Sequence, residues 1–162
     1  MASAKKALIE ALRAHMTEEI ATMRRLATEA AEAVGHEDNK PESDKDMRST
    51  EASYIARGQA ARVLDLEREL NLLGALPTDD LAPGALAGAG ALVRVQPPQG
   101  NPVTYLLVPA AGGVRLIAGG VSAQTLSIKS PLGAALIGLG EGDEAELNSP
   151  QGRRVVEILE VR

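Results

Sequence analysis

Two long segments with apolar residues spaced by three and four constrain this chain more than any other feature of its sequence. In the first segment, from residue 7 to 34, the repeating residues are Ile9, Leu12, Met16, Met23, Leu26, Ala30 and Ala33. In the second segment the same spacing gives Ala52, Ala56, Gln59, Val63, Leu66, Leu70 and Leu73. Such a heptad repeat is typical of helices that pair along a continuous seam. The first helix would be roughly 42 Å long at 1.5 Å per residue.

Each segment ends at a glycine, which supports its assignment as a helix. Gly35 follows the first segment, and Gly74 and then Pro77 follow the second, as is usual at helix C-termini. Because a short polar stretch joins the segments, we expect an antiparallel hairpin, with a coiled coil between two chains as the alternative. One polar residue interrupts each seam, Glu19 and Gln59, and such residues would determine the register if they faced each other.

The stretch at residues 36–50 is rich in acidic residues and forms the predicted tip of the hairpin. Glu42, Asp44 and Asp46 follow Pro41 at intervals of two residues. Asparagine and proline favour a turn here. Carboxylate oxygens suit Mg²⁺, but two or three of them bind it weakly unless a partner supplies further ligands. We therefore predict a metal site at Glu42, Asp44 and Asp46 that is shared with a larger partner.

A structural interpretation competes with this metal site. Asp44 or Asp46 would cap the second helix by accepting hydrogen bonds from its first N–H groups, and the other acids would be solvated. A self-contained calcium loop that starts at Glu42 is disfavoured. Its sixth position is Met47 where glycine is needed, and its twelfth is Ser53 where a bidentate glutamate is needed.

Proline and glycine interrupt all periodicity at residues 77–90, so we divide the chain into a hairpin at 1–76, a linker at 77–90 and a second domain at 91–162. In the second domain the period changes to two, which predicts strands at 91–95, 104–108, 114–117, 125–128, 144–147 and 154–161. Ser130 and Pro131 begin a short helix that ends near Ile137. The expected class is therefore α+β, with a small antiparallel sheet and one short helix.

Composition excludes several classes of function. The chain has no cysteine, which rules out disulfides, cysteine nucleophiles and cysteine-ligated zinc. Its net charge is −5 and it has no Phe or Trp, which argues against binding to free nucleic acid. No histidine follows His36, so the serines of the second domain have no such base and we expect no nucleophile there. No apolar run is long enough to span a membrane and no signal peptide is visible, so we expect a cytoplasmic protein.

The C-terminal half carries a recognisable pattern. It comprises residues 126–138 with Ser130-Pro131 at their centre, then Gly142-Asp143, residues 149–152 and the closing residues 157–161, with Tyr105 upstream. Over about residues 89–162 this pattern resembles the C-terminal domain of the GreA/GreB transcript cleavage factors. The resemblance implies an antiparallel coiled coil followed by an FKBP-like α+β domain.

The resemblance also implies a partner and a mechanism. In this family the globular domain docks on RNA polymerase, for which Ser130 and Pro131 are the implied residues, and the hairpin enters the secondary channel. There the tip carboxylates help to hold the second Mg²⁺ and orient the water that hydrolyses a backtracked transcript. The chain would then be a monomeric cofactor of the polymerase rather than an enzyme. It would contact the nascent RNA only indirectly.

The tip departs from the pattern of the family. The family string Gly-Asp-x-x-Glu-Asn-x-Glu-Tyr is absent, and only residues 51–54 match its end. Alignment through residues 62–67 places the tip acids at Glu42 and at Asp44 to Asp46, with Asp44 and Asp46 as the expected pair. Lys129 stands where the family often has Asn or Asp.

Three other functions remain open. The same architecture could occupy the channel as a regulator or inhibitor without cleavage, which the departure at the tip favours. FKBP-like domains can be prolyl isomerases, but their pockets are lined by aromatic residues that this chain lacks. A coiled-coil adaptor unrelated to transcription is the third alternative.

Overall fold

The computed structural model describes residues 3–36 and 42–162, and at positions 34–36, 42–46 and 49 it describes the backbone alone. The chain divides into two compact units. One unit combines Met1–Ala14 with Asn71–Arg162, and the other is His15–Leu70. The first turns of the first helix and the end of the second helix therefore belong to the same unit as the sheet.

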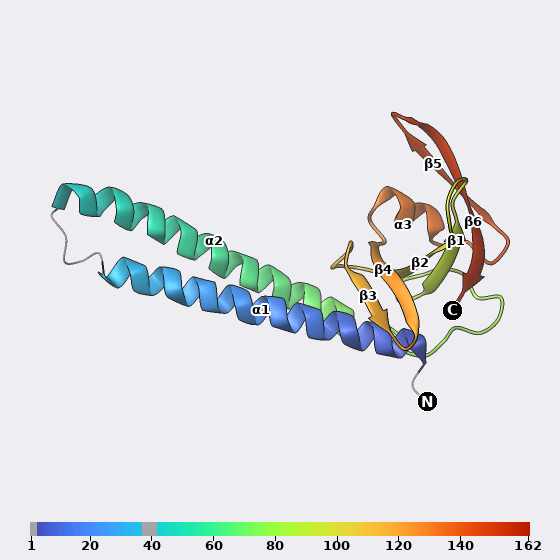
Figure 1. Cartoon of the computed structure of the whole chain (residues 1–162), viewed down its shortest axis with the longest axis horizontal. Helices are drawn as coiled ribbons and strands as arrows, with labels where there is room; N and C mark the ends of the chain where they lie inside the picture. The colour runs from blue at the N-terminus through green and yellow to red at the C-terminus, as the bar shows by residue number, and fades with distance from the viewer. Residues whose placement is uncertain (1–2, 37–41) are drawn as a thin grey trace. The chain divides into compact units, whose positions relative to one another are not determined.

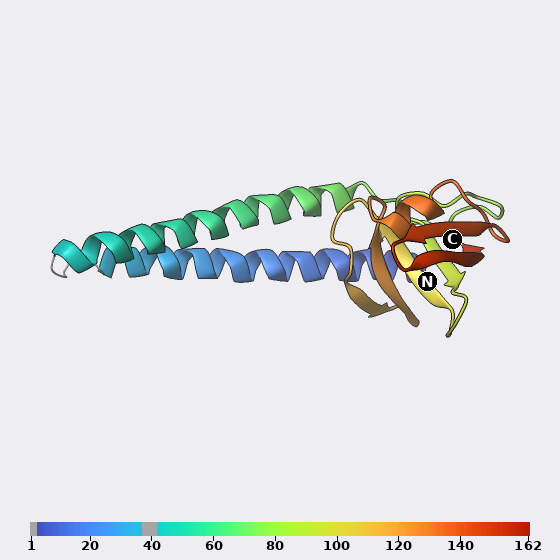
Figure 2. The same ribbon diagram turned by 90° about the horizontal axis from the view of Figure 1, so that it is seen from above.

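Helices α1 (Ala4–His36) and α2 (Glu42–Gly74) form the predicted antiparallel hairpin and lie side by side (Figures 1 and 2). Within His15–Leu70, the buried seam residues are Met16, Ile20, Val63 and Leu66. The heptad spacing points to Glu19 as a seam residue, but the buried side chain is that of the next residue, Ile20. Adjacent residues differ by about 100° around a helix, so the side chain of Ile20 faces α2 where that of Glu19 does not fully do so. Ala33, which the spacing places in the seam, is exposed.

The remainder of the chain forms a six-stranded sheet with a short helix, as the alternating pattern predicts. The strands are β1 (Leu92–Gln96), β2 (Val103–Val108), β3 (Arg115–Ala118), β4 (Val121–Ser127), β5 (Glu144–Ser149) and β6 (Gly152–Val161), and α3 (Pro131–Leu136) joins β4 to β5. Their order in the sheet is β3-β4-β2-β1-β6-β5 (Figure 1).

The sheet is mixed, whereas an antiparallel sheet was expected. Strands β2 and β4 run parallel, with Tyr105 opposite Gln124 and Val108 opposite Ser127. The other neighbouring strands are antiparallel. Alternation of apolar and polar residues shows that a segment is a strand, but it does not show whether the neighbouring strand runs in the same direction. The parallel pairing of β2 with β4 could therefore not be predicted from the sequence.

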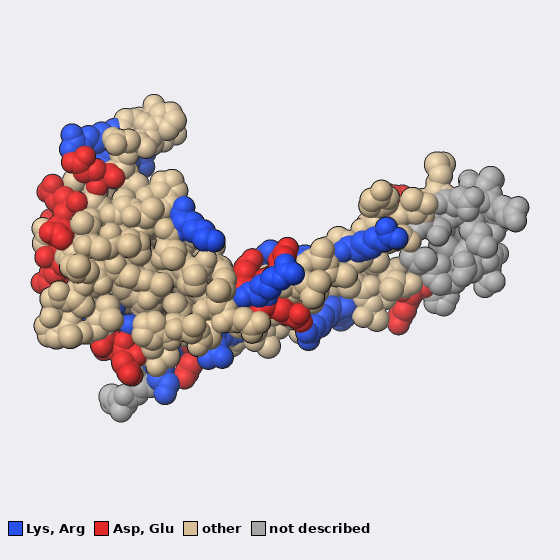
Figure 3. Space-filling view, turned by 180° about the vertical axis from the view of Figure 1, so that it is seen from behind, with Lys and Arg blue, Asp and Glu red and all other residues tan. Residues whose placement is uncertain are grey.

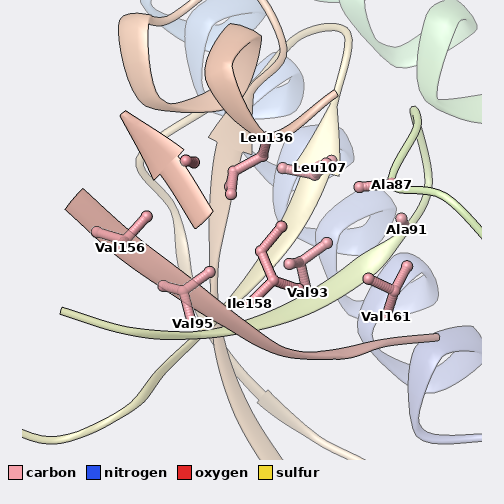
Figure 4. Close-up of a cluster of buried hydrophobic side chains, with 10 residues drawn as sticks. Ala87, Ala91, Val93, Val95, Leu107, Leu136, Val156, Ile158 and Val161 are labelled. Atoms are coloured by element: carbon pink, nitrogen blue, oxygen red, sulfur yellow. The ribbon is translucent and has the colours of Figure 1, made fainter. Parts of the chain in front are cut away.

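One face of the sheet carries the main core. Val93 of β1, Leu107 of β2 and Ile158 of β6 are fully buried together with Leu136 of α3 (Figure 4). Because the chain has no Phe or Trp, this core is filled with aliphatic side chains. The short helix α3 therefore lies against this face of the sheet and is held there by Leu136.

The opposite face is covered by the beginning of α1. Leu92 and Leu106 alternate with the core residues and are also buried. A Cβ atom on Gly119, in the turn between β3 and β4, would lie 2.8 Å from the Cα of Ala4 and 3.2 Å from the Cβ of Ala7. The first turns of α1 thus pack directly against the sheet.

Candidate functional site

The three acids predicted at the hairpin tip lie at the start of α2. This helix begins at Glu42, so Glu42, Asp44 and Asp46 are in its first turns and not in the long polar turn expected over residues 36–50. At 3.6 residues per turn, positions 42 and 46 share one side of the helix, and position 44 is about 200° further round. The side chains of all three acids and the whole of residues 37–41 lie outside the described residues.

A helix that begins with acidic residues has a physical explanation. The macrodipole of a helix places partial positive charge at its N-terminus, where carboxylates are stabilised. Acidic residues are therefore favoured by the sequence position at which α2 begins, and this preference is compatible with metal binding. The metal role of these residues stays a prediction.

Several large apolar side chains of α2 are exposed, and the heptad spacing gave no signal for the two most exposed of them, Met47 and Tyr54. Met47 is 77% exposed and Tyr54 is 72% exposed. They are seven residues apart and lie off the seam, so they share the outward side of α2. Elsewhere the helical unit displays charged side chains of both signs (Figure 3). Met47 and Tyr54 thus provide an apolar contact surface close to the acidic positions.

Ion pairs join the two helices. Arg24 of α1 pairs with Glu67 of α2, and Arg62 of α2 lies 3.9 Å from Glu19 of α1. Glu19, the polar residue that interrupts the first seam, is therefore matched by Arg62 of the other helix. Exposed pairs of this kind contribute about 0.2–1 kcal/mol each. They favour the observed register, while burial of the apolar seam supplies most of the stability.

The predicted docking residues Ser130 and Pro131 begin α3. The Ser130 hydroxyl donates to the carbonyl oxygen of Ser127 at 2.6 Å and accepts from the backbone N–H of Gly133 at 3.1 Å. Both bonds are internal, so Ser130 caps α3 and holds it in place. Pro131 is exposed at the first position of the helix, where no N–H is needed. Of the two residues, Pro131 is the more exposed, and the docking role of both stays a prediction.

Gly133 allows α3 to lie on the end of β4. A Cβ atom at this position would be 2.0 Å from the carbonyl oxygen of Ser127, so no larger residue fits unless the helix moves. On the outer side of the same helix, Pro131 and Ala134 are exposed, and Ile137 directly after it is 42% exposed. These three residues form a small apolar surface, which we call the α3 surface.

A hollow of about 780 Å³ lies beside α3. Its lining includes Leu132 of α3, Tyr105 of β2, and Leu147, Arg154 and Val155 of the β5–β6 hairpin. The lining is largely apolar, with the basic side chains of Arg153 and Arg154 at the hairpin. Tyr105, which the family pattern identified, is therefore part of the same region of the sheet unit as the α3 surface.

Lys5, in the first turn of α1, is fully buried, and sequence reasoning missed it because a lysine near a helix end is normally solvated. Its ammonium group donates to the backbone oxygen of Asp79 at 2.7 Å and so attaches the segment after α2 to the start of α1. Burial lowers the pKa of Lys5, and the carboxylates of Asp80 and Asp79 oppose this effect. Asp80 lies 3.7 Å from Arg162.

Within the described residues, no group of three or more His, Asp or Glu side chains is arranged to hold a metal ion. A metal site with three such ligands from this chain would therefore include at least one side chain outside the described residues. In the described part of the chain, no helix has both the length and the hydropathy that crossing a bilayer requires.

Comparisons with known proteins identify relatives by sequence. A family model described as "Transcription elongation factor, GreA/GreB, C-term" matches residues 87–162. Transcription elongation factor GreA of Cereibacter sphaeroides is 32% identical over 136 residues, which cover 82% of this chain and 80% of that protein. GreA of Syntrophobacter fumaroxidans is 50% identical over 42 residues, which cover 26% of this chain and 27% of that protein.

Solved structures with some likeness carry related names. GreA factor homolog 1 (Gfh1) of Thermus thermophilus is 22% identical, with 93% of this chain and 94% of that chain covered, at a TM-score of 0.37. A transcription elongation factor GreA/GreB from Nitrosomonas europaea is 26% identical, with 59% and 77% covered, at a TM-score of 0.36. At these TM-scores the structural likeness adds no weight to the matches in sequence.

Proposed function

Because this chain belongs to the GreA/GreB family of transcription elongation factors, we propose that it binds RNA polymerase and stimulates the polymerase's own cleavage of backtracked transcripts. The sheet unit docks on the polymerase, and the hairpin enters the secondary channel. The observation that supports this proposal is the acidic start of α2 at the end of the hairpin where the two helices connect. The protein is then a cofactor of the polymerase, and its contact with the nascent RNA is indirect.

The dimensions of the helices support a role at a distance. Each helix has 33 residues and is therefore about 50 Å long at 1.5 Å per residue. The paired helices are held together by the buried seam and by the ion pairs of Arg24 and Arg62. A pair of helices joined in this way at residues 16–24 and 62–67 is able to carry a small acidic cluster into a narrow passage.

The acidic positions fit a shared Mg²⁺ site in their chemistry. Glu42 and Asp46 are one turn apart on α2, and this spacing allows two carboxylates to approach one ion. Mg²⁺ takes carboxylate oxygens and keeps several waters, so a partial set of ligands is appropriate when the polymerase supplies the others. Bound Mg²⁺ supplies stabilisation of negative charge on the transcript during hydrolysis. The carboxylates of this chain hold the ion and orient the attacking water.

Cleavage of a stalled, backtracked transcript tests the proposal directly. Glu42→Gln/Asp46→Asn should abolish stimulation of cleavage and leave polymerase binding unchanged, because the substitutions remove charge and preserve shape. Asp44→Asn tests the pair expected from the alignment, and helical spacing predicts a smaller loss for it. Asp65→Asn, an exposed acid of α2 distant from residues 42–46 in sequence, is the matched control. Full stimulation by the double variant would refute the role of the acids.

Docking through the α3 surface is tested separately. Ile137→Ser should weaken binding to polymerase about tenfold, because an apolar side chain at the contact is replaced by a polar one. Ile117→Ser is the matched control, since Ile117 is 84% exposed on the edge strand β3 and is not part of the α3 surface. If Ile137→Ser and Ile117→Ser bound polymerase with equal affinity, the α3 surface would not be the site of docking.

The departure of the tip from the family string favours a second candidate function. A protein with the same fold and altered acids would occupy the secondary channel and regulate the polymerase without cleavage. In the same assay, such a protein would bind with unchanged affinity, give no cleavage and compete with a cleavage-active family member. The tip variants would then have no effect on activity.

A further inference from the structure

The helical unit divides into two parts that differ in packing. The proximal part comprises residues 15–22 of α1 and 60–70 of α2, and its seam contains the four buried side chains Met16, Ile20, Val63 and Leu66. The distal part comprises residues 23–33 and 50–59. Its seam positions are only half-buried and consist of Met23, Leu26, Ala27, Ala30, Ala52, Ser53, Ala56 and Gln59. Because the stabilisation from burial scales with apolar area, the distal pairing is the weaker one.

Gly58 lies at the boundary between these parts in α2. A Cβ atom at this position would meet nothing within 4 Å, and the backbone there is not in the left-handed region. Neither packing nor backbone conformation therefore requires glycine. A glycine inside a helix shifts the local equilibrium toward unfolding by about fivefold relative to alanine. Its presence weakens α2 at this point without any benefit to packing.

Gln59, the next residue, weakens the same point from the side of the seam. Its Oε1 atom is buried and, within the described residues, has no hydrogen-bond partner. A buried acceptor without a partner loses its hydrogen bonds to water when the seam closes and regains them when the seam opens. The side chain thus favours separation of the two helices at this position.

An open hollow of about 510 Å³ lies along the two helices next to this boundary. It is lined in part by Ala27 and Thr28 of α1 and by Ala60 and Leu64 of α2. Arg24, Val63 and Glu67 also line this hollow, so on α2 it extends along the proximal part.

From the half-buried distal seam, Gly58 and Gln59 we infer that α2 contains a hinge at Gly58–Gln59, about which the distal part opens and bends while the proximal part remains paired. The inference concerns the isolated protein and does not depend on the proposed function. If that function holds, the hinge allows the start of α2 to change position inside a partner without loss of the proximal seam. The hinge therefore predicts that the distal part of the hairpin has a lower free energy of local unfolding than the proximal part.

Amide hydrogen exchange of the full chain, corrected for intrinsic rates, tests the hinge. In the wild-type protein, amides of residues 50–57 should exchange at least about tenfold faster than those of residues 63–69. Gly58→Ala should slow exchange in the distal part about fivefold. Gln59→Leu should slow it by a similar or larger factor, because the buried acceptor is removed. Neither variant should change the proximal rates by more than about twofold.

Gly74→Ala is the matched control, because a Cβ atom on Gly74 also meets nothing within 4 Å. Gly74→Ala should leave the exchange rates of the distal amides unchanged. The comparison shows whether the slowing in Gly58→Ala is local to residue 58 or results from any replacement of glycine by alanine in α2. Equal protection of the two parts in the wild-type protein would overturn the inference. So would an equal slowing of exchange along the whole of α2 in the Gly58 and Gln59 variants, because the hairpin would then open as one unit.

Discussion

Replacing Gly133 with alanine tests whether backbone contact determines the position of α3. The added Cβ atom would be 2.0 Å from the carbonyl oxygen of Ser127, 2.8 Å from its carbonyl carbon and 3.0 Å from the Cα of Ile128. Real Cβ atoms almost never approach other atoms closer than 3.0 Å. Because all three neighbours are backbone atoms, they cannot rotate away, and α3 must move from β4 by about 1 Å or more.

The cost follows from the bonds that hold the start of α3. The Ser130 hydroxyl and backbone N–H both donate to the carbonyl oxygen of Ser127, at 2.6 and 3.0 Å, and the N–H of residue 133 donates to Ser130 Oγ at 3.1 Å. Loss of two of these bonds at about 1 kcal/mol each, with about 1–3 kcal/mol for overpacking, predicts a destabilisation of about 3–5 kcal/mol.

Urea denaturation measures this loss of unfolding free energy, provided that the signal reports on the sheet unit and not on the helical unit. Tyr105 is in the sheet and Tyr54 is on the exposed side of α2, so a Tyr54→Phe background leaves Tyr105 as the fluorescent probe. Gly88→Ala is the matched control, because a Cβ atom there meets nothing within 4 Å, and its effect should be within about 0.5 kcal/mol. A Gly133→Ala protein within about 1 kcal/mol of this control would refute the reasoning.

Three smaller effects are expected elsewhere. Since burial lowers the pKa of Lys5 from its ordinary 10.5, the unfolded chain binds more protons than the folded one just below pH 10.5. The unfolding free energy should therefore rise with pH there for the wild type relative to Lys5→Met, and parallel urea profiles from pH 8 to 10.5 would contradict this. A double-mutant cycle of Arg24→Gln and Glu67→Gln should give a coupling free energy of about 0.2–1 kcal/mol. This coupling should become smaller in 1 M salt, and a value that does not change with salt would argue against an exposed ion pair. Ser130→Ala should cost about 1 kcal/mol in urea denaturation through loss of the cap, and a loss as large as that of Gly133→Ala would be inconsistent with the clash argument.

The repeating patterns of the sequence were enough to predict the elements and their core. The three–four spacing identified Met16, Val63 and Leu66 as seam residues, and all are buried. The alternation of apolar residues identified every strand, and the Ser130-Pro131 pair identified the start of α3. These patterns succeed because each reflects a local geometry, 3.6 residues per helical turn or two per strand repeat.

Features that depend on contacts distant in sequence were not predictable. The parallel pairing of β2 with β4 depends on how the chain crosses the sheet, and the burial of Lys5 depends on its bond to the Asp79 backbone. The start of α2 was misplaced for a local reason. The predicted tip at residues 36–50 rested on Asn39 and Pro41 as turn formers, and the helix was expected to begin only near Asp44 or Asp46, although acidic residues are favoured in the first turn of a helix. The role of the acids in metal binding stays a prediction.

The order of strands has a consequence for synthesis of the chain on the ribosome. Strand β6 is the last to be made and lies between β1 and β5, while the first turns of α1 cover the other face of the same sheet. The helical unit has only contacts between nearby segments and is able to form as soon as residue 70 has emerged. The sheet unit, in contrast, must wait for residues 152–161, and until then the N-terminal residues that belong to it lack the completed sheet on which they pack.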